Sequence, residues 1–195
     1  MRLLITLFSC FLFMHCAVDR TMVTITKNET IILEKFQNLD TINKVFITVK
    51  KEPGQELMLC VTLIDKDSKK PLANQQVSFY HTDTHGEYNP SISNNESTAR
   101  LNGTAITNNS GEIYIKTILP GAYGSSEDTR HIHTTVHNAK PKAYDIFFKQ
   151  YSGNIAYIMD SGNDQMFFTD LKKTKENILV CFVTIEAKNI HTSNQ

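Results

Sequence analysis

Residues 108–123 read NNSGEIYIKTILPGAY, and their pattern recurs along most of the chain. The central run, EIYIKTIL at 112–119, is short and rich in β-branched and aromatic residues, which favour strands. An Asn-Asn-Ser-Gly cluster precedes the run and a Pro-Gly pair follows it, and both compositions are typical of turns. The segment therefore predicts one β-strand held between two turns.

Runs of the same kind lie on both sides of this segment, each bounded by polar, Gly, Asn or Pro clusters. They are KVFITVK (44–50), ELMLCVTLID (56–65), QQVSFYHTD (75–83), HIHTTVH (131–137), AYDIFFKQ (143–150) and NILVCFVTIEA (177–187). Many short strands with regular turns predict an all-β fold, a sandwich of two antiparallel sheets over residues 44–188.

Three other segments are assigned differently. Residues 17–43 predict one or two edge strands, or an extension that packs across the domain. The best helix candidate is short and lies at 164–176, DQMFFTDLKKTKE. The last residues, 189–195, are expected to be a disordered tail.

The charge balance argues against a nucleic-acid partner. The chain of 195 residues carries 20 basic and 20 acidic side chains, so it has no excess of positive charge to attract phosphates. Its hydrophobic content of 41% is sufficient for a buried core in one domain.

The first residues predict export. Arg2 precedes the apolar run LLITLFSCFLFM, which suits a signal peptide over residues 1–16 and is too short to span a bilayer. Cys10 and Cys16 each follow a sequence similar to a lipoprotein cleavage site, so lipid anchoring is one outcome and cleavage near Ala17 with free release is the other. We expect a secreted, periplasmic or surface-anchored protein with no membrane span.

Two cysteines remain in the predicted domain, Cys60 and Cys181, and both lie in apolar strand-like runs. An oxidising compartment permits a disulfide between them. Two separate buried thiols, packing as small hydrophobic side chains, are the alternative.

Four side chains carry the candidate chemistry. His131 and His133 are separated by one residue, so on a strand they point to the same side. Tyr88 follows a glycine in the long polar segment 81–101, and Tyr123 follows the Pro-Gly turn. A phenol loses its proton only to a strongly acidic cation, and ferric iron suits anionic oxygen together with imidazole better than zinc or copper does. The set therefore predicts an Fe(III) site.

These residues occur in an order that resembles the intradiol ring-cleavage dioxygenases, a family that includes protocatechuate 3,4-dioxygenase and catechol 1,2-dioxygenase. The resemblance covers roughly residues 54–150. It rests on KPLANQQVSFYHTDTHGEY (70–88), LNGTAITNNSGEIYIKTILPGAY (101–123) and HIH (131–133), taken together in this order.

The resemblance implies a small exported enzyme of aromatic catabolism with a transthyretin-like sandwich fold. Tyr88 and His133 would be equatorial iron ligands, and Tyr123 and His131 would be axial. The axial tyrosine would leave the iron when a catechol binds, and O2 would then open the ring between the two hydroxyl-bearing carbons. The substrate, the oligomeric state and the rate are not implied.

The sequence departs from this family pattern at two positions. Where many members have an arginine, three residues before the first histidine, Asp128 stands here. Arg130 is the candidate for that catalytic role, although a residue adjacent to His131 on a strand faces the opposite way. Where a glutamine is expected in the following strand, Asp145 stands.

A second interpretation remains open. A secreted β-sandwich binding module, similar to transthyretin or to carboxypeptidase regulatory domains, would share the strand pattern without catalysis. The fold alone does not decide between these functions. His81, His85 and His137 are not expected to be ligands, although His85 lies near the Gly-x-Tyr turn and is a candidate for lining a substrate cleft.

Overall fold

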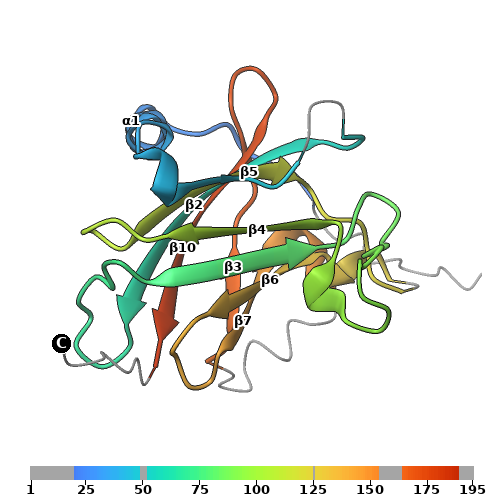
Figure 1. Cartoon of the computed structure of the whole chain (residues 1–195). Coiled ribbons are helices and arrows are strands. Elements are labelled where there is room, and N and C mark those ends of the chain that lie inside the picture. Colours follow the sequence, from blue (N-terminus) through green and yellow to red (C-terminus); the bar gives the residue numbers. More distant parts are fainter. Residues whose placement is uncertain (1–19, 49–51, 125, 154–163, 189–195) are drawn as a thin grey trace, which may run out of the picture.

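Two five-stranded sheets pack face to face in the computed structural model, which describes residues 20–48, 52–124, 126–153 and 164–188 (Figure 1). The predicted signal peptide, with Cys10 and Cys16, and the predicted tail lie outside the described residues. The predicted β-sandwich is confirmed. Within the described residues, no helix is both long and apolar enough to traverse a bilayer.

The first sheet has the strand order β1-β5-β2-β10-β9. Its strands are β1 Lys44–Phe46, β5 Glu112–Ile118, β2 Glu56–Asp65, β10 Leu179–Ala187 and β9 Lys172–Lys173. The second sheet has the order β4-β3-β6-β7-β8. Its strands are β4 Leu101–Ile106, β3 Gln76–His81, β6 His131–Val136, β7 Ala143–Phe148 and β8 Met166–Thr169.

The sheets are mixed, so the expectation of purely antiparallel pairing needs correction. The pairs β1–β5, β2–β10 and β7–β8 run parallel, whereas β2–β5, β3–β4, β3–β6 and β6–β7 are antiparallel. Parallel neighbours need long crossover connections. Short turn signals in a sequence identify hairpins but not crossover connections, so the strand pattern alone did not indicate the parallel pairs.

The main core lies between the two sheets. Leu57 and Leu59 of β2 and Ile113 and Ile115 of β5 meet Ile132 of β6 across this layer, and all five side chains are fully buried. Burying each such side chain stabilises the fold by roughly 1.5–3 kcal/mol. The alternate residues of β6 point outward, which exposes one face of that strand for chemistry.

The helix α1, Lys27–Gln37, covers the outer face of the first sheet (Figure 1). It buries Leu33 and Phe36 against a small cluster that includes Tyr114. Residues 27–37 are therefore a helix rather than one of the expected edge strands, although Thr24 makes an isolated β-bridge with Lys173. The alternative expectation was an extension that packs across the domain, and α1 does lie on the first sheet. Thr26 and Glu29 form a capping box at the start of α1, which outweighs the β-branched composition of the segment.

Residues 164–176 form β8 and β9 rather than the expected helix. β8 pairs with β7 and β9 pairs with β10, so strand pairing overrides the local composition. Cys60 and Cys181 are free buried thiols. They belong to separate hydrophobic clusters on opposite faces of the first sheet, so the disulfide is not formed.

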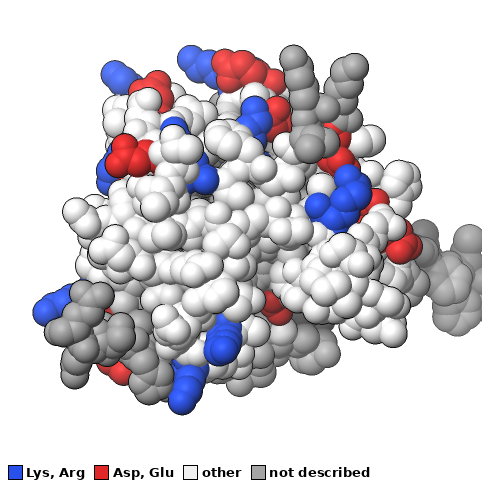
Figure 2. Space-filling model, viewed as in Figure 1, with Lys and Arg blue, Asp and Glu red and all other residues white. Residues whose placement is uncertain are grey.

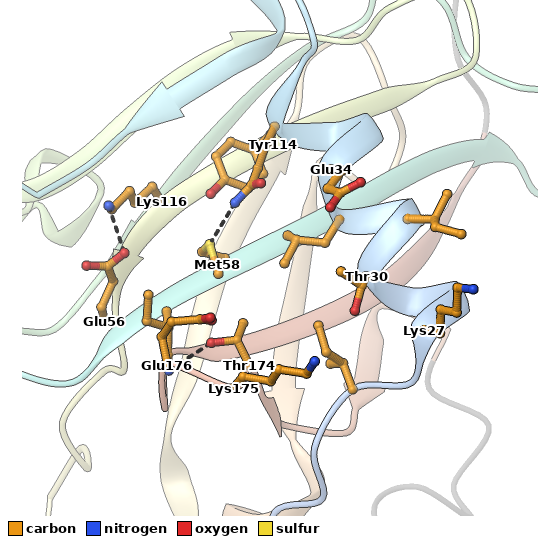
Figure 3. Close-up of a pocket in the computed structure, with 15 residues that line it drawn as sticks. Lys27, Thr30, Glu34, Glu56, Met58, Tyr114, Lys116, Thr174, Lys175 and Glu176 are labelled. Carbon is orange, nitrogen blue, oxygen red and sulfur yellow. Dashed lines mark hydrogen bonds and ion pairs between the residues drawn. The ribbon is translucent and has the colours of Figure 1, made fainter.

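A groove of about 740 Å³ lies between α1 and the outer face of the first sheet. Figure 3 shows Met58 and Tyr114 at its floor and the Lys116–Glu56 ion pair, 2.7 Å long, at its edge. None of the four predicted metal ligands lines this groove. In the view of Figure 2, the face over β3 and β4 carries mostly uncharged side chains.

Candidate metal centre

β6 places the two histidines of the His-Ile-His motif on its outward face. Ile132 between them is fully buried in the core, while the rings of His131 and His133 lie 4.3 Å apart, centroid to centroid, and meet edge to face. Their Nε2 atoms are 3.0 Å apart. The predicted same-side arrangement of these histidines is therefore what the structure has.

The other nitrogen of each ring is already bonded. His131 Nδ1 lies 2.6 Å from the carbonyl oxygen of Thr129, and His133 Nδ1 lies 2.9 Å from Asp145 Oδ1. Because a carbonyl and a carboxylate only accept hydrogen bonds, each Nδ1 carries a hydrogen, and in the neutral form of either ring the lone pair is at Nε2. Burial, reinforced by the neighbouring His133, lowers the pKa of His131 and favours its neutral form.

Tyr88 completes a three-atom convergence. Its side chain is buried, and its hydroxyl donates to His133 Nε2 over 2.8 Å. Burial and the negative charge of Glu96 raise the pKa of Tyr88, so its phenol is neutral without a cation. A bound cation would reverse this effect by stabilising the phenolate.

The arrangement fits a metal ion. Two nitrogens bound at right angles, each about 2.1 Å from one ion, are separated by about 3.0 Å, as the two Nε2 atoms are here. When both rings are neutral, the Nε2 lone pairs of His131 and His133 face each other and repel, and a cation bound between them would remove this repulsion. Within the described parts of the chain, no three His, Cys, Asp or Glu side chains gather to hold a metal, and the phenol that bonds to His133 Nε2 is that of Tyr88.

Tyr123 lies beside this group, on the turn that follows β5. Its ring centroid is 5.8 Å from that of Tyr88, and half of its surface is exposed. The Thr129 hydroxyl accepts the Tyr123 backbone N–H at 2.9 Å and lies 2.7 Å from the Tyr123 carbonyl oxygen. These contacts fold the segment between β5 and β6 back, so that Tyr123 is the most accessible of the four predicted ligands.

Arg130 lies away from this convergence. Its guanidinium donates to the Pro120 carbonyl at 2.7 Å and to Glu127 at 2.6 Å, and it lies 4.7 Å over the ring of Tyr151. The expected opposite orientation of Arg130 and His131 follows from strand alternation. Asp128 belongs to the 3-10 turn Glu127–Thr129.

The other three histidines that the structure describes do not join the group. His81 is fully buried, and both of its ring nitrogens bond to the protein, to the Thr82 carbonyl at 2.7 Å and to the Thr117 hydroxyl at 2.6 Å. His85 is exposed on the loop, and the ring of His137 bonds to Ser78.

Sequence reasoning missed Tyr80. Its ring stacks on His133, with centroids 4.5 Å apart and planes 21° apart. Tyr80 pairs directly with His133 in the β3–β6 register. Only this register reveals the contact, because Tyr80 and His133 are far apart in the sequence and belong to different motifs.

Known proteins resemble the chain in sequence and fold. The profile of a family described as "Dioxygenase" matches residues 35–193. Catechol 1,2-dioxygenase from Acinetobacter baylyi is 36% identical over 72 residues, which is 36% of this chain and only 23% of that protein's length.

Solved structures show the same fold. An intradiol ring-cleavage dioxygenase from Tetranychus urticae superposes with a TM-score of 0.54 and 21% identity, covering 76% of this chain and 88% of the other. The dioxygenase domain of a carbohydrate-binding fusion protein from Streptomyces sp. SirexAA-E has a TM-score of 0.54 and 18% identity, covering 72% and 84%.

Proposed function

The chain belongs to the intradiol dioxygenase family, and from this premise we propose that it opens the ring of a catechol-type aromatic with O2. Cleavage falls between the two hydroxyl-bearing carbons and gives a muconate-type dicarboxylic acid. The cofactor is Fe(III), held by Tyr88, Tyr123, His131 and His133. The observation that carries the proposal is that His133 Nε2 lies 2.8 Å from Tyr88 Oη and 3.0 Å from His131 Nε2.

A bound ferric ion would supply the redox chemistry between a catechol and O2. The imidazoles of His131 and His133 would hold it through Nε2. Thr129 and Asp145 fix the ring orientations by accepting the Nδ1 hydrogens. The ring of Tyr80 packs on His133 and restricts its rotation further.

Tyr123 has a separate part in the reaction. Tyr123 is half exposed whereas Tyr88 is buried, so Tyr123 is the one of the two tyrosines that a substrate would reach. Tyr123 would be the group that accepts a proton from a substrate hydroxyl. Arg130 stabilises the turn that carries Tyr123 by donating a hydrogen bond to the Pro120 carbonyl.

The proposal includes export. It is supported by the apolar segment after Arg2, and a mass measurement on protein released by an expressing cell tests it. A mature chain starting near Ala17 indicates free release, and a lipid-modified Cys16 or Cys10 indicates anchoring.

Colour tests the iron site directly. Protein loaded with Fe(III) should be red to purple from phenolate-to-iron charge transfer, and the band should shift when catechol is added. Tyr88→Phe combined with Tyr123→Phe should remove the colour, and His133→Ala should abolish iron retention. Tyr114→Phe, which changes a buried tyrosine of the other sheet, is the matched control and should keep the colour.

Oxygen uptake with a series of catechols then identifies the substrate. Colourless protein that retains no iron would overturn the proposal and favour a binding module on the same sandwich. Colour that persists in the double tyrosine variant would also overturn it.

A further inference from the structure

Two glycines bring the loop that carries Tyr88 against the segment that carries Tyr123. Gly86 has a φ of +85°, and a Cβ on it would lie 2.1 Å from the Ala122 carbonyl oxygen. A Cβ on Gly121 would lie 2.4 Å from the Gly86 nitrogen. Since real Cβ atoms do not approach backbone so closely, the two segments touch backbone to backbone only because both residues lack a side chain.

The backbone of Asp83 joins the same two segments. Its carbonyl oxygen accepts hydrogen bonds from the N–H of Gly86 at 3.1 Å and of Gly121 at 2.8 Å. Its own N–H donates to the Glu87 carbonyl at 2.9 Å, which closes the tight turn before Tyr88. One carbonyl thus ties the Tyr88 loop both to itself and to the segment that leads to Tyr123.

The carboxylate of Asp83 holds that turn from inside. Oδ1 accepts the backbone N–H groups of His85 at 2.9 Å and Glu87 at 3.2 Å, and Oδ2 accepts the side-chain amide of Asn89 at 3.2 Å. Hydrogen bonds to a charged acceptor contribute more to stability than those between neutral groups. The Asp83 side chain is 13% exposed, so water competes little for these contacts.

Arg100 anchors the carboxylate to the body of the domain. Its guanidinium lies 3.6 Å from Asp83 Oδ2 and makes two parallel hydrogen bonds of 2.8 Å to Glu52, whose pKa it lowers. The Arg100 backbone N–H also donates to the Tyr88 carbonyl at 2.8 Å. The ion pairs and this bond fix both ends of the loop on which Tyr88 lies.

We propose that Asp83 is a positioning residue that sets the separation of Tyr88 and Tyr123 at the candidate metal centre. The inference rests on the proposed function, because it takes the two tyrosines as ligands. Asp83 touches neither the ring of Tyr88 nor that of Tyr123 in any hydrogen bond of the described structure; it acts through the peptide units that lead to them. Residues that orient ligands in this way typically change metal affinity by about 10–100-fold when they are replaced.

The test compares three variants with the unaltered protein. Asp83→Ala removes every carboxylate contact, and Asp83→Asn keeps an acceptor for the backbone N–H groups but loses the charge facing Arg100. Asp65→Ala is the matched control. The Asp65 carboxylate likewise caps a turn, accepting hydrogen bonds from Ser68 N and Oγ at 2.7 Å, but Asp65 is the last residue of β2 and belongs to a different turn from Asp83. Each variant is titrated with Fe(III), its charge-transfer band is recorded, and amide hydrogen exchange is measured on the metal-free protein.

Asp83→Ala should bind Fe(III) about 10–100-fold more weakly, shift the charge-transfer band and lose exchange protection at the Gly86 and Gly121 amides. Asp83→Asn should lie between it and the unaltered protein, and Asp65→Ala should match the unaltered protein. Unchanged iron affinity and band in Asp83→Ala would overturn the proposal. If the alanine variant does not fold, an asparagine variant equal to the unaltered protein would overturn it as well.

The exchange measurement separates this inference from the proposed function. If the unaltered protein binds no iron, the proposed function fails. The loss of Gly86 and Gly121 protection in metal-free Asp83→Ala would still support the role of Asp83 in joining the two segments, and retained protection would overturn it.

Discussion

The buried imidazole of His81 should make the protein acid-sensitive. His81 ends β3 with no exposed surface, and burial lowers its pKa from 6.5 to about 4. Its two ring nitrogens are matched to a neutral ring, since the Thr82 carbonyl accepts from Nδ1 and the Thr117 hydroxyl donates to Nε2. Protonation would place a charge in the core and oppose the bond from Thr117.

The sign and size follow from proton linkage. Well above pH 6.5 neither the folded nor the unfolded state binds a proton at His81, so the residue adds little pH dependence there. As the pH falls toward 4 the unfolded state binds the proton first, and the free energy of unfolding decreases. For a pKa of 6.5 unfolded and about 4 folded, the loss between pH 7 and 4.5 is about 2 kcal/mol.

Urea unfolding at a series of pH values measures this effect. His81→Gln should reduce the pH dependence of the free energy of unfolding between pH 7 and 4.5 by about 2 kcal/mol, whatever it does to stability at pH 7. His85→Gln is the control for the loss of a histidine, because the His85 side chain is exposed on the loop. A His81→Gln curve that runs parallel to that of the unaltered protein would refute the assigned role of His81.

Three further outcomes are expected. Asp145→Asn should weaken Fe(III) binding about 10–100-fold by loosening the orientation of the His133 ring, and a metal titration that shows no change would contradict this. Gly86→Ala should destabilise the fold by more than about 1 kcal/mol, because it combines a positive φ with a backbone clash; denaturant midpoints measure it. Cys60 and Cys181 should resist a thiol reagent until urea unfolds the protein, because burial raises both thiol pKa values, and rapid labelling of native protein would count against their burial.

The strands could be read from the sequence where each is framed by turns and faces one core. The predicted bounds of β2 and β5 are close to the observed ones, because each run of apolar and β-branched residues is flanked by the turn residues Gly, Pro or Asp. β4 was missed because its sequence, LNGTAI, contains a glycine and follows a long polar loop. In the structure that glycine, Gly103, lets Val45 of β1 pack closely, so a weak strand signal marks a contact between sheets.

The four candidate ligands could be named from the sequence because they sit in short motifs of recognisable order. Their partners could not. Asp83 and Arg100 act through backbone groups and an ion pair to Glu52, and no local pattern distinguishes such a carboxylate from one that caps an ordinary turn. The same ambiguity applied to α1, where Thr26 and Glu29 form the capping signal inside a segment of strand-like composition.

The register across the second sheet explains what the motifs left open. Tyr80 pairs with His133, and His133 pairs with Asp145, so these three residues form one row across β3, β6 and β7. In that row one face of His133 is covered by an aromatic ring and its Nδ1 is fixed by a carboxylate, which leaves Nε2 directed at the Tyr88 hydroxyl and His131. Asp145, which first stood out as a departure from the family pattern, is therefore the residue that sets the tautomer of His133. A substitution at Asp145 should act on iron binding before it acts on any substrate, and that order distinguishes an orienting carboxylate from one that contacts substrate.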